Sequence, residues 1–171
     1  QDDVLVSGFY WRFDNGSGEE SSFPKKAEIP EPFPGVKYGI SYEFDGIADQ
    51  IYMKMHGITW RTEILRQMPL SIDEHCYYVD AEYILYPIPW VKTVSFIPDF
   101  VYQYRIGMST QSMSIENMMK RCSQHERVLK RIMDFYDKHK TCAAAEMIRD
   151  MAARLAVSQY KIYLSFPRSH K

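Results

Sequence analysis

An acidic and aromatic stretch in the middle of the chain holds the residues best suited to chemistry. Residues 73–83 contain four carboxylates, one histidine and three tyrosines. Carboxylates rarely lie among large apolar groups unless a cleft holds them or they cap a helix. Partial desolvation by the tyrosines would raise the pKa of Asp80 towards the range of a general base. Asp80 is therefore the candidate catalytic residue, and simple N-capping of the following helix is the alternative.

Other polar residues are candidates for contacts with a ligand. His56 can hydrogen-bond a hydroxyl or a phosphate, with Arg61 nearby, or it holds a turn. Gln111 stands before a predicted helix, where main-chain amides bind an anion or form only a polar cap. Glu82 shares the acidic stretch with Asp80, and its residue type alone favours a solvated or ion-paired side chain.

Several motifs of nucleotide and metal chemistry are absent from the sequence. It contains no glycine-rich phosphate loop, no Cys-x-x-Cys, no His-Glu-x-x-His and no Asp-x-Asp. The chain therefore offers no obvious site for nucleotide phosphates or for a metal ion.

Composition and charge limit the class of protein. The 171 residues are 46% hydrophobic, which is typical of one ordinary globular domain. Net charge is −4 over residues 1–34, −3 over residues 35–114 and +6 over residues 115–171. The basic last third favours contact with nucleic acid, anionic lipid or a phosphorylated ligand, or else solvent exposure of its helices. Three widely spaced cysteines and the lack of an apolar run of ~20 residues favour a reducing, cytoplasmic location.

The first two thirds are predicted to alternate strands, loops and short helices. Residues 4–13 are β-branched and aromatic, which predicts a central strand. The other expected elements are an extended loop over 19–36, helices over 44–55, 59–66 and 80–86, and strands over 91–97 and 100–106 separated by Pro98-Asp99.

The last third is predicted to be helical. Ser114 is a good N-cap for a helix over residues 115–138, with Glu116 in its first turn. Thr141 is expected to cap a final helix. The two helices should form a hairpin packed on the sheet, so residues 1–114 and 115–171 are expected to form two parts.

Four segments resemble bacterial family 2 glycosyltransferases of capsule and exopolysaccharide synthesis. They are DVLVSG (residues 3–8), KMHGITWRTEIL (54–65), DEHCYYVDAEY (73–83), and VYQYRIG (101–107) with QSMS (111–114). The similarity runs from residue 3 to residue 138, in the order and with the spacing that the family shows.

The resemblance implies the acceptor-side part of a GT-A fold, an α/β structure with a mixed sheet, flanking helices and a C-terminal helical hairpin. It implies transfer of a sugar, with inversion, from a nucleotide sugar to a glycan or lipid-linked acceptor in cell-surface polysaccharide synthesis. In such enzymes an acidic residue at the position of Asp80 deprotonates the acceptor hydroxyl. His56, Arg61, Glu82 and Gln111 become candidates for the acceptor or diphosphate side.

The chain departs from the family because the nucleotide-binding half with its Asp-x-Asp is not present. A divalent metal (Mg or Mn) would be bound in the whole enzyme by residues absent here, and no metal ligand is assigned in this chain. We therefore expect the chain alone to be inactive, and to self-associate through exposed sheet edges. Contact with the inner face of the cell membrane is expected and a nucleic-acid partner is not.

A non-enzymatic module is the alternative function. In that case residues 73–83 would only cap a helix, and the basic helices would bind a partner protein or an anionic ligand such as nucleic acid.

Overall fold

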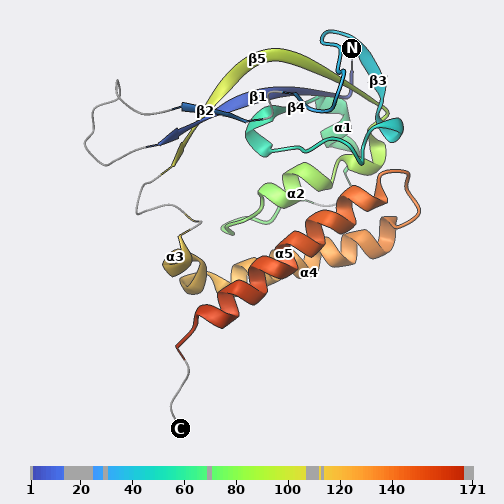
Figure 1. Cartoon of the computed structure of the whole chain (residues 1–171). Coiled ribbons are helices and arrows are strands. Elements are labelled where there is room, and N and C mark those ends of the chain that lie inside the picture. The colour runs from blue at the N-terminus through green and yellow to red at the C-terminus, as the bar shows by residue number, and fades with distance from the viewer. Residues whose placement is uncertain are drawn as a thin grey trace.

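The protein is a mixed α/β structure with a sheet on one side and helices on the other (Figure 1). This computed structural model describes residues 2–13, 25–28, 31–68, 71–106, 112 and 114–167.

The sheet is built around β1 (Val4–Phe13), which is central as predicted. On one side β1 pairs in parallel with β5 (Thr93–Ile106). On the other side it pairs antiparallel with β4 (Ile58–Trp60) and β2 (Lys25–Glu28). The strand β3 (Ser41–Glu43) adds antiparallel to β5, so the sheet is mixed. The prediction of a single extended loop over residues 19–36 is wrong where β2 lies, and residues 19–24 and 29–30 are outside the described part.

Pro98-Asp99 does not divide β5 into two strands, contrary to the prediction. Ile97 pairs with Ser7, and Phe100 pairs with the next residue, Gly8, so the two intervening residues form a bulge. A bulge tolerates proline because its residues need not donate to the ladder. A Cβ on Gly8 would lie 2.8 Å from the ring of Phe100, so the bulge brings that ring onto a position that favours glycine.

The predicted helix over residues 44–55 is wrong. The structure has two 3₁₀-helices there, η2 (Phe44–Gly46) and η3 (Met55–Gly57), joined by turns and an extended segment. Ile51 and Met53 are buried while the residue between them is exposed, which is the alternation of an extended chain. The helical spacing of apolar residues was therefore coincidental.

Two short helices follow. The predicted helix over 59–66 begins late, as α1 (Thr62–Gln67), because the residues before Arg61 form β4. The helix predicted from Asp80 is confirmed as α2 (Asp80–Leu85), and η4 (Ile88–Trp90) follows it.

The C-terminal helices differ in their boundaries from the prediction. The helix expected over 115–138 is interrupted at Arg121 into α3 (Ile115–Lys120) and α4 (Cys122–His139). The predicted cap is confirmed, since the hydroxyl of Ser114 accepts a hydrogen bond from the amide of Asn117 at 3.3 Å. The last helix, α5 (Ala145–Ser165), begins after Thr141 rather than at it.

The helical hairpin of α4 and α5 is confirmed, but α2 lies between it and the sheet (Figure 1). In that middle layer Tyr86 packs against Phe135 of α4, with ring centroids 4.9 Å apart. A single apolar core nevertheless joins the layers; it includes Val4, Phe96, Leu85, Val128 and Ile148.

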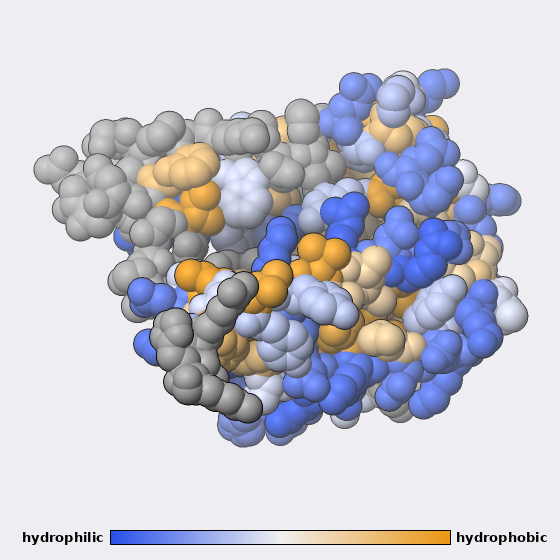
Figure 2. All heavy atoms as spheres, turned by 60° about the horizontal axis from the view of Figure 1, so that its bottom comes forward, coloured by the Kyte–Doolittle hydropathy of each residue, from blue (hydrophilic) through white to orange (hydrophobic). Residues whose placement is uncertain are grey.

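Apolar side chains remain exposed near the end of α5. Leu164 is 83% exposed and Val157 is 54% exposed. Figure 2 shows the underside of the molecule, where hydrophobic side chains gather between hydrophilic ones. None of the described helices combines the length and the apolar character that crossing a bilayer requires.

Gly57 tests the packing of η3 on the sheet. Gly57→Ala is expected to lower the free energy of unfolding by about 1–3 kcal/mol. The reason is that the new Cβ would lie 2.7 Å from the main-chain oxygen of Ser7 in β1. Urea denaturation followed by circular dichroism measures the change. Gly46→Ala is the control, because a Cβ there meets nothing within 4 Å; equal losses for the two variants would contradict the packing.

Candidate functional site

The pocket around Asp80 is lined by segments of the chain that are distant in sequence. Its volume is about 410 Å³. The walls are η3 with the residue before it, the loop leading into α2, and aromatic residues of β1 and β5. The lining residues are Trp11, Lys54, Met55, His56, Cys76, Tyr77, Tyr78, Val79, Asp80, Tyr104 and Ser112.

Asp80 is the first residue of α2 and does not cap it. The cap position is occupied by Val79, and no side chain caps this helix. The chain reaches α2 through Tyr78, whose φ of 71° lies in the left-handed region that bulky residues avoid. Tertiary contacts hold this conformation: the Tyr78 hydroxyl donates to the carbonyl of Ser112 at 3.1 Å. The turn into the pocket is therefore imposed by packing.

Burial raises the pKa of Asp80 above its ordinary value. The main-chain amides of Ala81 and Asp80 and the charge of Lys54 oppose the shift without cancelling it. Asp80 as a whole residue is nevertheless exposed by surface area. A concave pocket accounts for both the desolvation of the carboxyl group and the exposure of the residue, because protein atoms surround the group while one side of the pocket is open to solvent. Asp80 thus combines reduced hydration with access for a ligand, as a general base requires.

His56 lies in the same pocket, inside a cluster of aromatic rings. Its ring is tilted on Tyr104 at 4.7 Å and stacked on Tyr102 at 5.3 Å. Phe9 of β1 meets it edge-on at 4.0 Å. His56 therefore both holds the η3 turn against the sheet and lines the pocket, so the two sequence-based interpretations are compatible.

Arg61 lies outside the pocket and pairs with Asp3. Its Nη2 is 2.8 Å from Oδ1 of Asp3, a buried residue. The other carboxylate oxygen of Asp3 accepts hydrogen bonds from the amides of Lys92 at 2.8 Å and Thr93 at 3.2 Å. Arg61 thus ties the end of β4 to β1 and to the start of β5.

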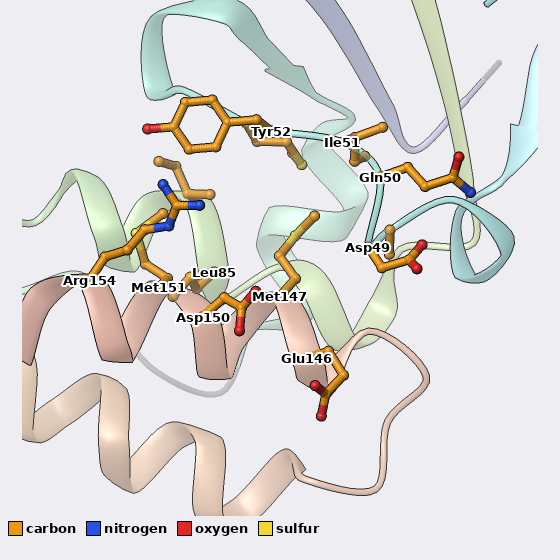
Figure 3. A pocket seen from close by; sticks show the side chains of 13 residues that line it. Asp49, Gln50, Ile51, Tyr52, Leu85, Glu146, Met147, Asp150, Met151 and Arg154 are labelled. Carbon is orange, nitrogen blue, oxygen red and sulfur yellow. The ribbon is translucent and has the colours of Figure 1, made fainter. Parts of the chain in front are cut away.

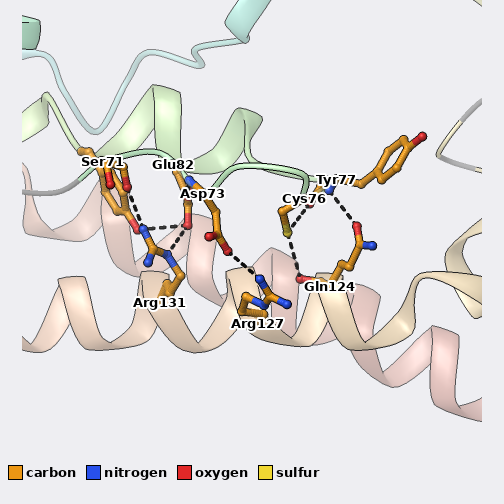
Figure 4. A network of polar contacts seen from close by, with 9 residues as sticks. Ser71, Asp73, Cys76, Tyr77, Glu82, Gln124, Arg127 and Arg131 are labelled. Carbon is orange, nitrogen blue, oxygen red and sulfur yellow. Dashed lines mark hydrogen bonds and ion pairs between the residues drawn. The ribbon is translucent and has the colours of Figure 1, made fainter.

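Glu82 also lies outside the pocket, at the contact between α2 and α4 (Figure 4). Its side chain is fully buried, and Nε of Arg131 lies 2.6 Å from Oε1. The carboxylate also accepts hydrogen bonds from the amide of Asp73 at 2.8 Å and the hydroxyl of Tyr86 at 3.1 Å. Burial, together with the charge of Glu82, raises the pKa of Tyr86 to about 12.

Helix α4 fixes the loop that forms one pocket wall (Figure 4). Arg131 donates to the carbonyl of Ser71 at 2.8 Å, and the Gln124 side chain accepts from the amide of Tyr77 at 2.9 Å. Arg121 lies 3.5 Å from the centre of the Tyr77 ring. The wall is therefore held in place by α4 and by Arg121, the residue before it.

The structure thus brings Asp80 and His56 together and places Arg61 and Glu82 elsewhere. Gln111 lies outside the described residues, and its neighbour Ser112 lines the pocket.

The sequence reasoning did not single out Lys54, Trp11 or Tyr104 as pocket residues. The signal for the aromatic residues was present in the alternation of Phe9 with Trp11, and of Tyr102 with Tyr104, which places each pair on one face of a strand. Lys54 gave no comparable signal.

His125 lies close to the pocket, and the sequence reasoning did not identify it either. It is buried, its Nδ1 is 2.6 Å from Oε1 of Gln159, and its ring meets Tyr78 edge-on at 5.0 Å. Burial lowers the pKa of His125, while Gln159 and the charge of Asp80 oppose the shift. The imidazole is therefore favoured in its neutral form beside the pocket.

The described residues do not fit a metal site or a thiol nucleophile. No group of three or more metal-ligating side chains occurs among them. Cys76 lines the pocket as a free thiol, and burial together with Asp73 raises its pKa, which disfavours the thiolate.

Comparison with protein-family models, with curated proteins and with solved structures found no match to this chain.

The buried ion pair between Glu82 and Arg131 can be tested by replacing the arginine. Arg131→Met is expected to lower the free energy of unfolding by about 3 kcal/mol, because it leaves the buried carboxylate of Glu82 without a cation. Arg127→Met is the control on the same helix, since Arg127 is 58% exposed in its 3.4 Å pair with Asp73. The free energy of unfolding of this control variant should fall by less than about 1 kcal/mol. Chemical denaturation measures both, and a control loss as large as that of Arg131→Met would count against the assignment.

The raised pKa of Asp80 predicts how stability changes with pH. An acid whose pKa is higher in the folded state than in the unfolded state costs stability once it ionises. That cost is absent below the unfolded pKa of about 3.9 and is complete above the folded pKa. Asp80→Asn removes it, so the stability of this variant relative to wild type should rise between these two pKa values. Denaturation at a series of pH values tests the sign; a relative loss with rising pH would show that the charged carboxylate stabilises α2.

Proposed function

We propose that this chain is the acceptor-binding part of an inverting glycosyltransferase, in which Asp80 deprotonates the acceptor hydroxyl. The observation that carries the proposal is the desolvated Asp80 carboxylate in an aromatic pocket that a ligand can enter. The resemblance of four segments to family 2 glycosyltransferases supports the same chemistry, and the mixed sheet is compatible with the acceptor side of a GT-A fold.

The reaction needs a single base on this side. As the acceptor oxygen attacks the anomeric carbon, its proton passes to a carboxylate oxygen of Asp80. The new carbon–oxygen bond forms while the bond to the nucleoside diphosphate breaks on the opposite face, which inverts the configuration. The raised pKa of Asp80 makes its carboxylate a stronger base than that of an ordinary aspartate.

The aromatic walls suit a sugar. One face of a pyranose presents C–H groups and packs on aromatic rings, while its edge presents hydroxyl groups. Trp11 and Tyr104 supply rings on one side of the pocket, with their centroids 5.0 Å apart. His56 lies against Tyr104, with the ring centroids 4.7 Å apart, and adds a further ring to this wall.

Lys54 sets the charge of the pocket. Its ammonium group favours the ionised form of Asp80 and would orient the carboxylate before the proton is transferred. Arg61 and Glu82 have no such role in the proposal, because each is committed to an ion pair outside the pocket.

The donor side is assigned to polypeptide outside this sequence. In the proposal, the nucleotide sugar and a divalent metal are bound there, as the resemblance to family 2 glycosyltransferases implies. Peripheral contact with the cytoplasmic face of the membrane and self-association stay predictions from the sequence.

The proposal is tested by Asp80→Asn in a polypeptide that joins this chain to its donor-binding half. The substitution keeps the shape of the side chain and removes the base, so kcat should fall by about 10²–10⁴-fold with little change in the KM for the acceptor. Release of nucleoside diphosphate in the presence of acceptor gives the rate.

Glu74→Gln is the matched control, because Glu74 is an exposed carboxylate of the same acidic stretch. It should retain activity. Full activity of Asp80→Asn would refute the role of Asp80 as the base, and unfolding of Asp80→Asn would favour a purely structural role.

A further inference from the structure

A second pocket lies between residues 48–53 and the first half of α5 (Figure 3). Its volume is about 280 Å³. Met147 and Met151 of α5 and Leu85 of α2 give it an apolar lining. Methionine side chains adapt their shape to a ligand, so this lining suits the uneven surface of a flexible chain.

The second pocket and the Asp80 pocket lie at opposite ends of the same short helix. Asp80 is the first residue of α2 and lines one pocket, while Ile84 and Leu85 at the other end line the second. Six helical residues span about 9 Å. A ligand of a few linked sugar units is long enough to reach from one pocket to the other.

One segment of the chain borders both pockets. Tyr52 lines the second pocket and Lys54 lines the first. The ammonium group of Lys54 is 4.9 Å from the centre of the Tyr52 ring, so a lining residue of one pocket contacts a lining residue of the other. A ligand that leaves the Asp80 pocket beside Lys54 therefore meets Tyr52 next.

The rim of the second pocket suits hydroxyl groups. Asp49, Glu146 and Asp150 place carboxylates around it, and Arg154 is the basic residue in the lining (Figure 3). Arg154 lies 5.3 Å from the centre of the Tyr52 ring, which is 37% exposed. Sugar hydroxyls donate to carboxylates and accept from a guanidinium group, while the C–H face of the sugar packs on the ring and the methionines.

The charge of the second pocket is expected to discriminate between neutral and acidic glycans. The lining holds three carboxylates and one guanidinium group. Arg149 pairs with Glu146 and, at 3.5 Å, with Asp150, which only partly offsets the negative charge. A glycan that carries carboxylates of its own would meet repulsion here.

We propose that the second pocket is a remote subsite for the acceptor, and that the acceptor is an uncharged oligosaccharide rather than a single sugar. This inference rests on the proposed function, because it takes the occupant of the Asp80 pocket to be the end of that oligosaccharide. Contacts made by the distant sugars hold the terminal hydroxyl at Asp80, which is how binding remote from the reacting atoms serves catalysis.

Binding to this 171-residue chain tests the subsite without any transfer reaction. The probes are the disaccharides and hexasaccharides of neutral glucan, mannan and galactan, and a hexamer of galacturonic acid. Calorimetry should show at least one neutral hexasaccharide bound at least tenfold more tightly than its disaccharide, and more tightly than the acidic hexamer. Amide shifts in NMR spectra should change around both Tyr52 and Asp80 for that hexasaccharide.

The double variant Tyr52→Ala with Asp150→Asn should reduce hexasaccharide affinity to that of the disaccharide and leave disaccharide binding unchanged. Tyr38→Ala is the control, since Tyr38 is 39% exposed and lines neither pocket. Hexasaccharides bound no more tightly than disaccharides, or an unaffected double variant, would overturn the subsite. Acidic hexamer bound as tightly as the neutral ones would overturn its selectivity.

The outcomes separate the two proposals. One outcome is binding that depends on oligosaccharide length and on Tyr52 while Asp80→Asn keeps full activity. That outcome would support the subsite and rule out Asp80 as the base. Loss of activity in Asp80→Asn without length-dependent binding would retain the base and reject the subsite.

Discussion

The buried carboxylate of Glu82 constrains the rest of the structure. A fully buried charge is tolerated only with a cation and further hydrogen bonds, and Arg131, the amide of Asp73 and the hydroxyl of Tyr86 supply them. These partners join α2, α4 and the loop before α2. Successive residues of a helix are rotated by about 100°, so Asp80 points away from Glu82 by about 200°. A helix that buries Glu82 against α4 therefore turns Asp80 towards η3 and the sheet, where the pocket lies.

A second acid–arginine pair holds the opposite wall. Asp3 and Arg61 join β1, β4 and the start of β5, and η3 with His56 directly precedes β4 in the chain. The pocket thus lies between two charged contacts that are not part of it. Arg61 and Glu82 were reasonable candidates by residue type, since the same charges that bind a ligand also bind each other. The residue type alone does not tell a ligand-binding charge from a charge in an internal ion pair. The fold does, because a buried charged side chain needs a partner inside the protein.

The sequence correctly predicted the elements that depend on interactions between residues close in sequence. Strand β1, the start of α2, the Ser114 cap and the helical hairpin each follow from residue type and spacing. The predictions were wrong at the bulge at Pro98-Asp99, in the irregular segment over 47–54 and at the helix break at Arg121. The bulge depends on the pairing of β5 with β1, which is distant in sequence. The same limit applies to the site. Asp80 and His56 were identified from their neighbours in sequence, but the contributions of Trp11 and Tyr104 depend on the parallel register of β1 with β5.

Asp80 and Glu82 show how one helix gives two carboxylates different properties. Glu82 is deep in the structure and bound by a guanidinium group, so its charge is used to hold elements together. Asp80 lies in a pocket where its nearest helpers are main-chain amides and the charge of Lys54, and desolvation outweighs them. An arginine bound to Asp80 as Arg131 is bound to Glu82 would lower its pKa and weaken it as a base. In the proposed mechanism, the lack of a comparable ion pair for Asp80 among the described residues leaves its carboxylate able to accept a proton from the acceptor hydroxyl.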